Sequence, residues 1–368
     1  MGIVFLNIPI YAFSVHNFLT PNIWYLVLII CIALYSILMS GYRSKLLLPS
    51  MALVLFLGVY IIYSIVDPSL EIFSTIFLYT VAWMITLLYL NYSSNINIFK
   101  YLLLILSSLI FFDFFYSGVL YNYELAGSVF GRGSGTHINS NQAGEVLLIL
   151  LVLASAKDKD IFKSWTLIIF FAAIVLTFSR SAILFSILMG FFIYVKNLKY
   201  FLFFIISLLI IYFTYLNILN SVLLPEAVTE NLIGRLDFFT NLNIEDYSSS
   251  SRIDVVNNSF DHFLLSPMFG NGMNYTHSPL FGSVRPHNTL LLLIVEYGVI
   301  GLTMYIYLVA LLLRGAFIKN TVNGFMPISM FIFFSMFNHD ILFQLHWLIF
   351  LILSVSYLRT PISGQSNF

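Results

Sequence analysis

The sequence predicts an all-α polytopic membrane protein, a bundle of about twelve transmembrane helices with one large external loop. Hydrophobic residues make up 60% of the 368-residue chain and charged residues only 9%, far below the roughly 25% that is typical of soluble domains. The mean hydropathy is +0.96. The apolar residues also occur in runs of about 20, the length that an α-helix needs to cross a bilayer.

The apolar runs define the individual elements, nine before the long loop and three after it. The expected spans are residues 3–19, 23–39, 46–66, 70–90, 98–118, 139–156, 164–178, 181–195, 199–219, 287–313, 324–337 and 341–358. The chain then consists of transmembrane helices 1–9 (residues 1–219), a loop (220–286) and transmembrane helices 10–12 (287–368), all in one integral membrane domain.

Charge and cysteine content exclude several classes of protein. The formal net charge is zero and there is no basic tail, so nothing indicates nucleic-acid binding. A single cysteine leaves neither a disulfide framework nor a cysteine-based metal site.

Lysines and arginines in the short connections predict the orientation. If the spans alternate, all eight lysines fall on one side, which we expect to be cytoplasmic together with both termini. On the opposite side every lysine or arginine is an arginine. These residues are Arg132, Arg180, Arg235, Arg252 and Arg285. A guanidinium group grips phosphate through two parallel hydrogen bonds, which an ammonium group cannot do. The pattern favours an anionic ligand, although a topological bias against lysine would also leave such arginines behind.

Arg180 lies in a tight turn, Ser179-Arg180-Ser181, between two apolar runs. Its guanidinium is expected at the membrane surface or in the bundle interior, where a charge usually has a partner or a function. An interfacial arginine that extends toward water is the alternative.

The large loop contains one amphipathic helix. Ser251 and Asp254 fit a capping box, and apolar residues follow on one face before Pro267: Ile253, Val256, Phe260, Phe263 and Leu264. The helix is expected on the membrane surface or over the bundle. Arg252 would then lie in its first turn, where the helix dipole favours an anion. A surface pair with Asp254 or Glu245 is the other interpretation.

The loop ends in Arg285, Pro286 and His287, directly before an apolar run. An unperturbed imidazole titrates near pH 6.5, so His287 could accept a proton from a hydroxyl group; a satisfied polar residue at a helix start is the alternative. Glu296 lies about 13 Å deeper along the helix, which favours a structural carboxylate. Carboxylates near the external ends of other spans could hold an arginine in place, and these are Asp113, Glu145 and Asp340.

Three segments together resemble a known family. They are "LTFSRSAILFSILMGFFIY", then "GRLDFF" with "SSSSRIDVVNNSFDHFLLSPMFGNGMNY", then "RPHNTLLLLIVEYGVIGLTMYIYLVALLL". Their order and spacing, over about residues 125–315, are similar to those of the O-antigen polymerase and ligase superfamily, the Wzy- and WaaL-type membrane glycosyltransferases.

The resemblance implies roles for individual residues. Arg180 and Arg252 match the essential arginines of the family and His287 matches its loop-end histidine, while Arg235 and Arg285 would help to bind a diphosphate. The upstream segment "GRGSGTHINSNQAGEVLLILLVLA" is also similar to the family, so Arg132 and His137 are candidate supporting residues, as is Glu296.

The family works at the periplasmic face of the bacterial inner membrane on undecaprenyl-diphosphate-linked glycans, without a nucleotide sugar. The resemblance therefore implies an inverting glycosyltransferase with no cofactor and no metal. Expected partners are the lipid-linked oligosaccharide, the bilayer, and a chain-length regulator and flippase of the same pathway.

Three functions are compatible with these motifs. We favour an O-antigen polymerase, because the loop is rich in Ser, Asn and Tyr and offers few extra cations for an anionic lipid A-core acceptor. An O-antigen ligase uses the same donor and is the main alternative. A lipid-linked oligosaccharide transporter or flippase fits less well, because no internal repeat is visible.

Overall fold

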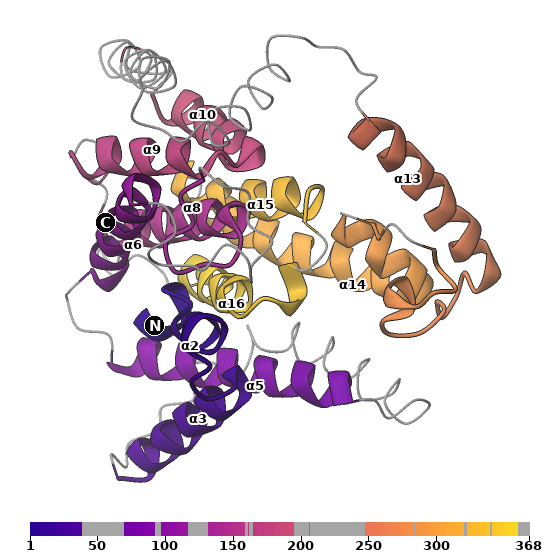
Figure 1. Cartoon of the computed structure of the whole chain (residues 1–368), viewed down its shortest axis with the longest axis horizontal. Coiled ribbons are helices and arrows are strands. Elements are labelled where there is room, and N and C mark those ends of the chain that lie inside the picture. Colours follow the sequence, from indigo (N-terminus) through magenta and orange to yellow (C-terminus); the bar gives the residue numbers. More distant parts are fainter. Residues whose placement is uncertain are drawn as a thin grey trace, which may run out of the picture. The chain divides into compact units, whose positions relative to one another are not determined.

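In the computed structural model, the described residues form α-helices with turns and loops between them (Figure 1). The described residues are 1–38, 70–92, 97–116, 132–158, 161, 165–194, 206, 247–282, 285–286, 288–319, 322–338 and 341–359. Within these ranges there is no β-strand, in agreement with the predicted all-α class. Arg235, His287 and Asp340 lie outside the described residues.

The chain divides into two compact units. The first contains Met1–Tyr25 and Ser94–Asn243, and the second contains Leu26–Ser93 and Ile244–Phe368. The predicted division of the chain at 219/220 and 286/287 concerns membrane topology and stays a prediction.

The first unit is a helical bundle. Its helices are α1 (Gly2–Phe5), α2 (Ile8–His16), α6 (Ile98–Phe115), α8 (Ser140–Lys157), α9 (Thr166–Thr177) and α10 (Arg180–Tyr194). Helix α6 packs against α8 and α9, and α8 packs against α10. The predicted first span 3–19 is not one continuous helix, because Asn7 adopts a left-handed conformation (φ 52°) between α1 and α2.

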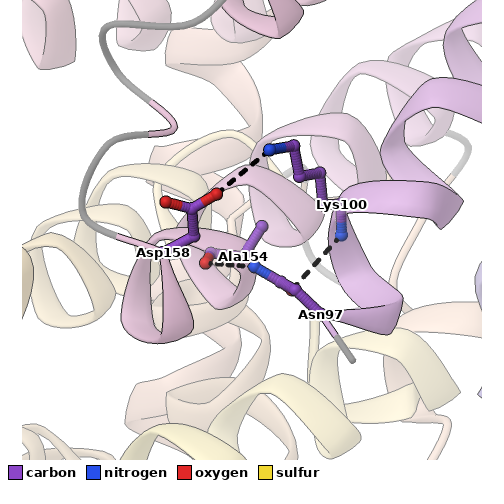
Figure 2. Close-up of polar contacts among 4 residues, drawn as sticks. All are labelled: Asn97, Lys100, Ala154 and Asp158. Carbon is purple, nitrogen blue, oxygen red and sulfur yellow. Dashed lines mark hydrogen bonds and ion pairs between the residues drawn. The ribbon is translucent and has the colours of Figure 1, made fainter. Parts of the chain in front are cut away.

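Helices α6 and α8 run in opposite directions, as alternating spans require. The start of α6 meets the end of α8 through an ion pair of 3.1 Å between Lys100 Nζ and Asp158 Oδ2 (Figure 2). Beside it, Asn97 Nδ2 donates to the carbonyl oxygen of Ala154 at 2.9 Å. At the other end of the unit, Gly133 lies against Ile110 of α6 and donates its backbone N–H to Leu176 of α9. Helices α6 and α9 therefore end, and α8 and α10 begin, at one and the same end.

The second unit is built around one long helix. Its elements are most of α3 (Pro21–Leu38), α5 (Leu70–Tyr92), α13 (Tyr247–Leu265), the 3-10 turn η2 (Tyr275–His277), α14 (Thr289–Lys319), α15 (Val322–Ser335), the 3-10 turn η3 (Ile341–Phe343) and α16 (Leu345–Arg359). Helix α14 packs against α13, α15 and α16, and α16 packs against α5.

Several helices have the composition of membrane spans. Among the described residues, Ile98–Phe115 and Thr289–Phe317 are long and apolar enough to cross a bilayer. Shorter apolar helices occur at 75–86, 140–156, 166–177, 180–191, 324–335 and 345–355. These helices agree with an all-α membrane protein.

Helix α14 is broken at Gly298, so the predicted span 287–313 is not a regular helix. Gly298 has φ 61° and ψ −147°, which lie outside the helical region. The turn after α13 fills this break. Asn271 N–H donates to Val295 (2.9 Å), and Val299 N–H donates to the carbonyl oxygen of Pro267 (2.9 Å). Loop residues thus replace the hydrogen bonds that the break removes.

Two glycines allow the loop and the helix to cross backbone to backbone. A Cβ atom at Gly270 would lie 2.3 Å from the carbonyl carbon and oxygen of Glu296. At Gly298, a Cβ atom would lie 2.5 Å from the carbonyl oxygen of Pro267. Both glycines also have positive φ, so any other residue would be strained as well as crowded.

Helix α13 begins earlier than predicted, and most of its predicted apolar stripe is exposed. It begins at Tyr247, so the capping box at Ser251 and Asp254 is wrong. Four of the five residues of the predicted stripe are exposed, with Ile253 62% and Leu264 69% accessible. The face that packs on the unit carries buried Val255 and Ser259, together with half-buried Phe263, which contacts the cluster of Phe281, Ile294 and Val295.

Replacement of Gly270 should destabilise the protein more than replacement of Gly272. Both have positive φ, but a Cβ atom at Gly272 would meet no atom within 4 Å. We expect Gly272→Ala to cost about 1–2 kcal/mol from backbone strain alone. The added clash should bring Gly270→Ala above about 4 kcal/mol. Thermal unfolding of the detergent-solubilised protein measures both, and equal losses would contradict the backbone crossing.

Candidate functional site

The predicted site residues fall into both structural units, and each group is described on its own. Arg132, His137 and Arg180 belong to the first unit. Arg252, Arg285 and Glu296 belong to the second.

Arg180 is the first residue of α10 and is half-buried. Helix α9 ends at Thr177, and Phe178 then takes a left-handed conformation (φ 50°) that reverses the chain. The hydroxyl oxygen of Ser179 accepts the backbone N–H of Ala182 at 3.4 Å, as a helix cap does. The tight turn predicted from the sequence is present, one residue earlier than expected.

Close packing of α8 holds this turn. A Cβ atom at Gly144 would lie 2.7 Å from Cβ of Ala182 and 3.2 Å from Cβ of Ser179, so glycine lets α8 approach the start of α10. Thr177 adds a local contact, because its Oγ1 accepts the backbone N–H of Ser179 at 3.3 Å. Packing against α8 and the hydrogen bond from Ser179 to Thr177 thereby fix the backbone that carries Arg180.

Arg132 is buried, with 8% of its surface accessible. Its Nε donates to the carbonyl oxygen of Thr177 (3.0 Å), and its Nη2 donates to that of Phe178 (3.2 Å). The same Nη2 donates to Oδ1 of Asn141 on α8 at 2.7 Å. The guanidinium is thus bonded to the end of α9.

The segment after Arg132 is pinned by a carboxylate of α6. Asp113 Oδ2 accepts the backbone N–H of Ser134 (2.7 Å), the Ser134 hydroxyl (3.1 Å) and the backbone N–H of Gly135 (3.1 Å). Thr136 Oγ1 donates to the carbonyl oxygen of Leu6 at 2.5 Å. Among the described residues, Asp113 therefore holds a loop and not an arginine. Glu145 is buried on α8.

His137 is 1% accessible, and neither ring nitrogen has a hydrogen-bond partner among the described residues. Burial lowers the pKa of His137 to about 3, because desolvation disfavours the charged imidazolium. The side chain is therefore neutral at physiological pH. It has neither the exposure nor the charge to meet an anionic substrate.

In the second unit, Arg252 lies further along its helix than predicted. Because α13 begins at Tyr247, Arg252 is its sixth residue and lies in the second turn. The free N–H groups of the first turn are therefore not next to it along the chain. Its predicted place in the first turn is therefore wrong, and its role in binding an anion stays a prediction.

The end of the loop is bonded at Asn288 and Thr289, where α14 begins. Arg285 is exposed, and Pro286 is buried. Asn288 caps α14, because its Oδ1 accepts the N–H groups of Leu290 (2.8 Å) and Leu291 (3.3 Å). The Thr289 hydroxyl donates to the carbonyl oxygen of Asn338. Sequence reasoning missed this cap, although an asparagine directly before an apolar run is its usual signal.

Glu296 is buried beside the break in α14, with 1% of its surface accessible. Its Oε1 accepts the Thr276 hydroxyl at 2.6 Å and the Thr276 N–H at 3.3 Å. Asn271 Nδ2, on the same loop, donates to the carbonyl oxygen of Val295 at 3.0 Å. Glu296 thus holds the loop against α14, as expected for a structural carboxylate.

Comparison with known proteins identifies the region that carries these residues. Residues 165–306 match the model of a family described as O-antigen ligase (Wzy_C). This region belongs to the O-antigen polymerase and ligase superfamily. No curated protein matches the chain.

The Wzy_C match extends from the start of α9 into the second half of α14. It includes Arg180, Arg252, Arg285 and Glu296, and the resemblance in the sequence is thereby confirmed. The match supports O-antigen polymerase or ligase activity, that is, a glycosyltransferase-like membrane enzyme of O-antigen assembly. Arg132 and His137 lie before the matched region.

Proposed function

We propose that this member of the Wzy_C family is an O-antigen polymerase. In this proposal it transfers a glycan from undecaprenyl diphosphate onto a second lipid-linked repeat unit, at the periplasmic face of the bacterial inner membrane. The family match supports the class of reaction, that of an O-antigen polymerase or ligase. The choice of acceptor rests on the burial of Arg132.

The mechanism follows from the charge that the reaction creates. The acceptor hydroxyl attacks the anomeric carbon while the bond from that carbon to the diphosphate oxygen breaks, which inverts the anomeric centre. Arg180 and Arg252, helped by Arg235 or Arg285, would bind the diphosphate and stabilise its growing negative charge. His287 would take the proton of the acceptor hydroxyl.

In this mechanism arginines supply the positive charge that a metal ion supplies in many sugar-nucleotide enzymes. Turnover should therefore continue in the presence of EDTA. The half-buried position of Arg180 at a helix start supports its role, because a partly desolvated charge interacts more strongly with a phosphate than a fully hydrated one does.

The burial of Arg132 favours the polymerase over the ligase. A ligase must recognise lipid A-core, a large anionic acceptor, and should offer external cations beyond those that bind the donor. Arg132 is an external arginine that is not assigned to the donor, but its guanidinium is bonded to the carbonyl oxygens of Thr177 and Phe178. A polymerase, whose acceptor presents sugar hydroxyls, does not need such a cation.

The distribution of charge in the first unit supports the proposed orientation. Lys100, paired with Asp158, marks one end of the bundle. Arg132 and Arg180 lie at the end where α9 stops and α10 starts. The lysine end would be cytoplasmic and the arginine end periplasmic by the positive-inside rule.

Reporter fusions test this orientation. Fusions at Lys159, Lys199 and Lys319 should report the cytoplasm, because lysine-rich connections remain on that side. A fusion near Ser250 should report the periplasm. A cytoplasmic signal at Ser250 would contradict both the topology and the periplasmic site.

Deletion of the gene in its native host separates the two enzymes. Loss of a polymerase should leave lipid A-core that carries a single repeat unit, because ligation continues. Gel electrophoresis of the lipopolysaccharide measures this. Bare core with polymer accumulating on undecaprenyl diphosphate, restored by this gene alone, would establish the ligase instead.

Arg180→Lys and Arg252→Lys should each remove most of the activity although the charge remains. A lysine cannot make two-point contacts to a diphosphate, and each lost contact in the transition state costs about 2–4 kcal/mol. Arg359→Lys, at the end of α16, is the matched control and should be nearly silent. Turnover by the membrane-inserted variants is the measurement. Full activity of Arg180→Lys would favour an interfacial anchor.

A further inference from the structure

We propose that Arg132 is a positioning residue that clamps the end of α9 and thereby orients Arg180. The inference rests on the function proposed above for Arg180. In this role Arg132 does not contact substrate; it acts through the turn that carries Arg180.

The clamp satisfies three successive carbonyl groups. The last carbonyls of an α-helix have no partner within the helix. Here Gly133 N–H donates to Leu176 at 2.9 Å, and the Arg132 guanidinium donates to Thr177 and Phe178 at 3.0 and 3.2 Å. The whole end of α9 is therefore bonded to a segment that precedes it in the chain by more than 40 residues.

The clamped turn is conformationally strained. Phe178 has φ 50°, in the left-handed region that residues other than glycine and asparagine seldom adopt. Such a conformation persists when the surrounding contacts enforce it. Two observed contacts do so: the hydrogen bond from Arg132 to the Phe178 carbonyl, and the stacking of the Phe178 ring on Phe114, with centroids 6.3 Å apart.

The shape of the guanidinium suits this task. Its planar fork reaches two carbonyl oxygens of the α9 end and the side chain of Asn141 on α8 together. The backbone next to Arg132 lies directly against α6, because a Cβ atom at Gly133 would lie 2.8 Å from the carbonyl oxygen of Ile110. Arg132 thus links α8 to the end of α9, while the neighbouring Gly133 packs on α6.

The link to Arg180 is short. Only Ser179 separates the clamped carbonyl of Phe178 from Arg180. The side chain of Ser179 caps α10, so a shift of the turn would move the first residue of α10 with it. A displacement of about 1 Å in a group that positions a substrate can lower a rate by roughly 100-fold.

A double-mutant cycle tests the inference, with turnover measured per amount of folded, membrane-inserted protein. Arg132→Gln should lower kcat about 10- to 100-fold in the wild-type background. In the Arg180→Lys background the same change should have little further effect, because the contact that it disturbs is already lost. Arg314→Gln, an exposed arginine on α14, is the control and should leave turnover unchanged.

The outcomes separate the two proposals. If Arg180→Lys is inactive and Arg132→Gln lowers its residual activity by the full factor again, Arg132 acts independently and this inference alone is overturned. If Arg180→Lys is fully active, the proposed role of Arg180 fails and the clamp loses its function with it. Unchanged kcat with a lower yield of protein would show a purely structural role and also overturn the inference.

A suppressor provides a second, independent measurement. Phe178→Gly should restore part of the turnover of Arg132→Gln, because glycine adopts the left-handed conformation without support. No restoration is expected if Arg132 binds substrate. Should Arg132→Gln fail to insert, Arg132→Lys replaces it in the cycle. Lysine lacks the planar fork that joins the two carbonyl oxygens to Asn141, so wild-type turnover in that variant would refute the clamp.

Discussion

Backbone polar groups inside an apolar bundle must find partners within the protein, and this constraint governs the described structure. Regular helices satisfy their own groups, but the end of α9 and the break in α14 do not. In both places a loop segment supplies the missing hydrogen bonds: Arg132 and Gly133 at α9, and residues 267–272 at α14. These loops are consequently bonded directly to the helices that they cover.

The scarcity of charge makes each buried charged group informative. Asp113 and Glu296 are both buried, and both accept hydrogen bonds from a loop backbone and a neighbouring hydroxyl. Arg132 is bonded to carbonyl oxygens in the same manner. Burial of a charge without such partners would cost several kcal/mol, so these groups are retained where they hold loops. Arg180 and Arg285 are more accessible and remain suited to an anionic ligand.

Local patterns predicted some features well and others poorly. The helical class, the turn before Arg180 and the structural role of Glu296 all follow from hydropathy and spacing. The capping box at Ser251 was wrong, because a four-residue motif cannot tell where the preceding chain becomes helical. The apolar stripe of α13 has the expected period, yet packing uses another face, where Asn258 donates to the carbonyl oxygen of Phe281 at 2.7 Å.

The sequence by itself determined the membrane character of the chain, through its apolar runs, and the family resemblance of residues 165–306, through three ordered motifs. Only the tertiary structure decided that α14 breaks at Gly298 and that Arg132 faces backbone carbonyls and not solvent. The physical reason is distance along the chain. Hydropathy and helix periodicity depend on neighbouring residues. Thr177, whose carbonyl oxygen Arg132 bonds, lies 45 positions away, and no local sequence pattern predicts such a contact.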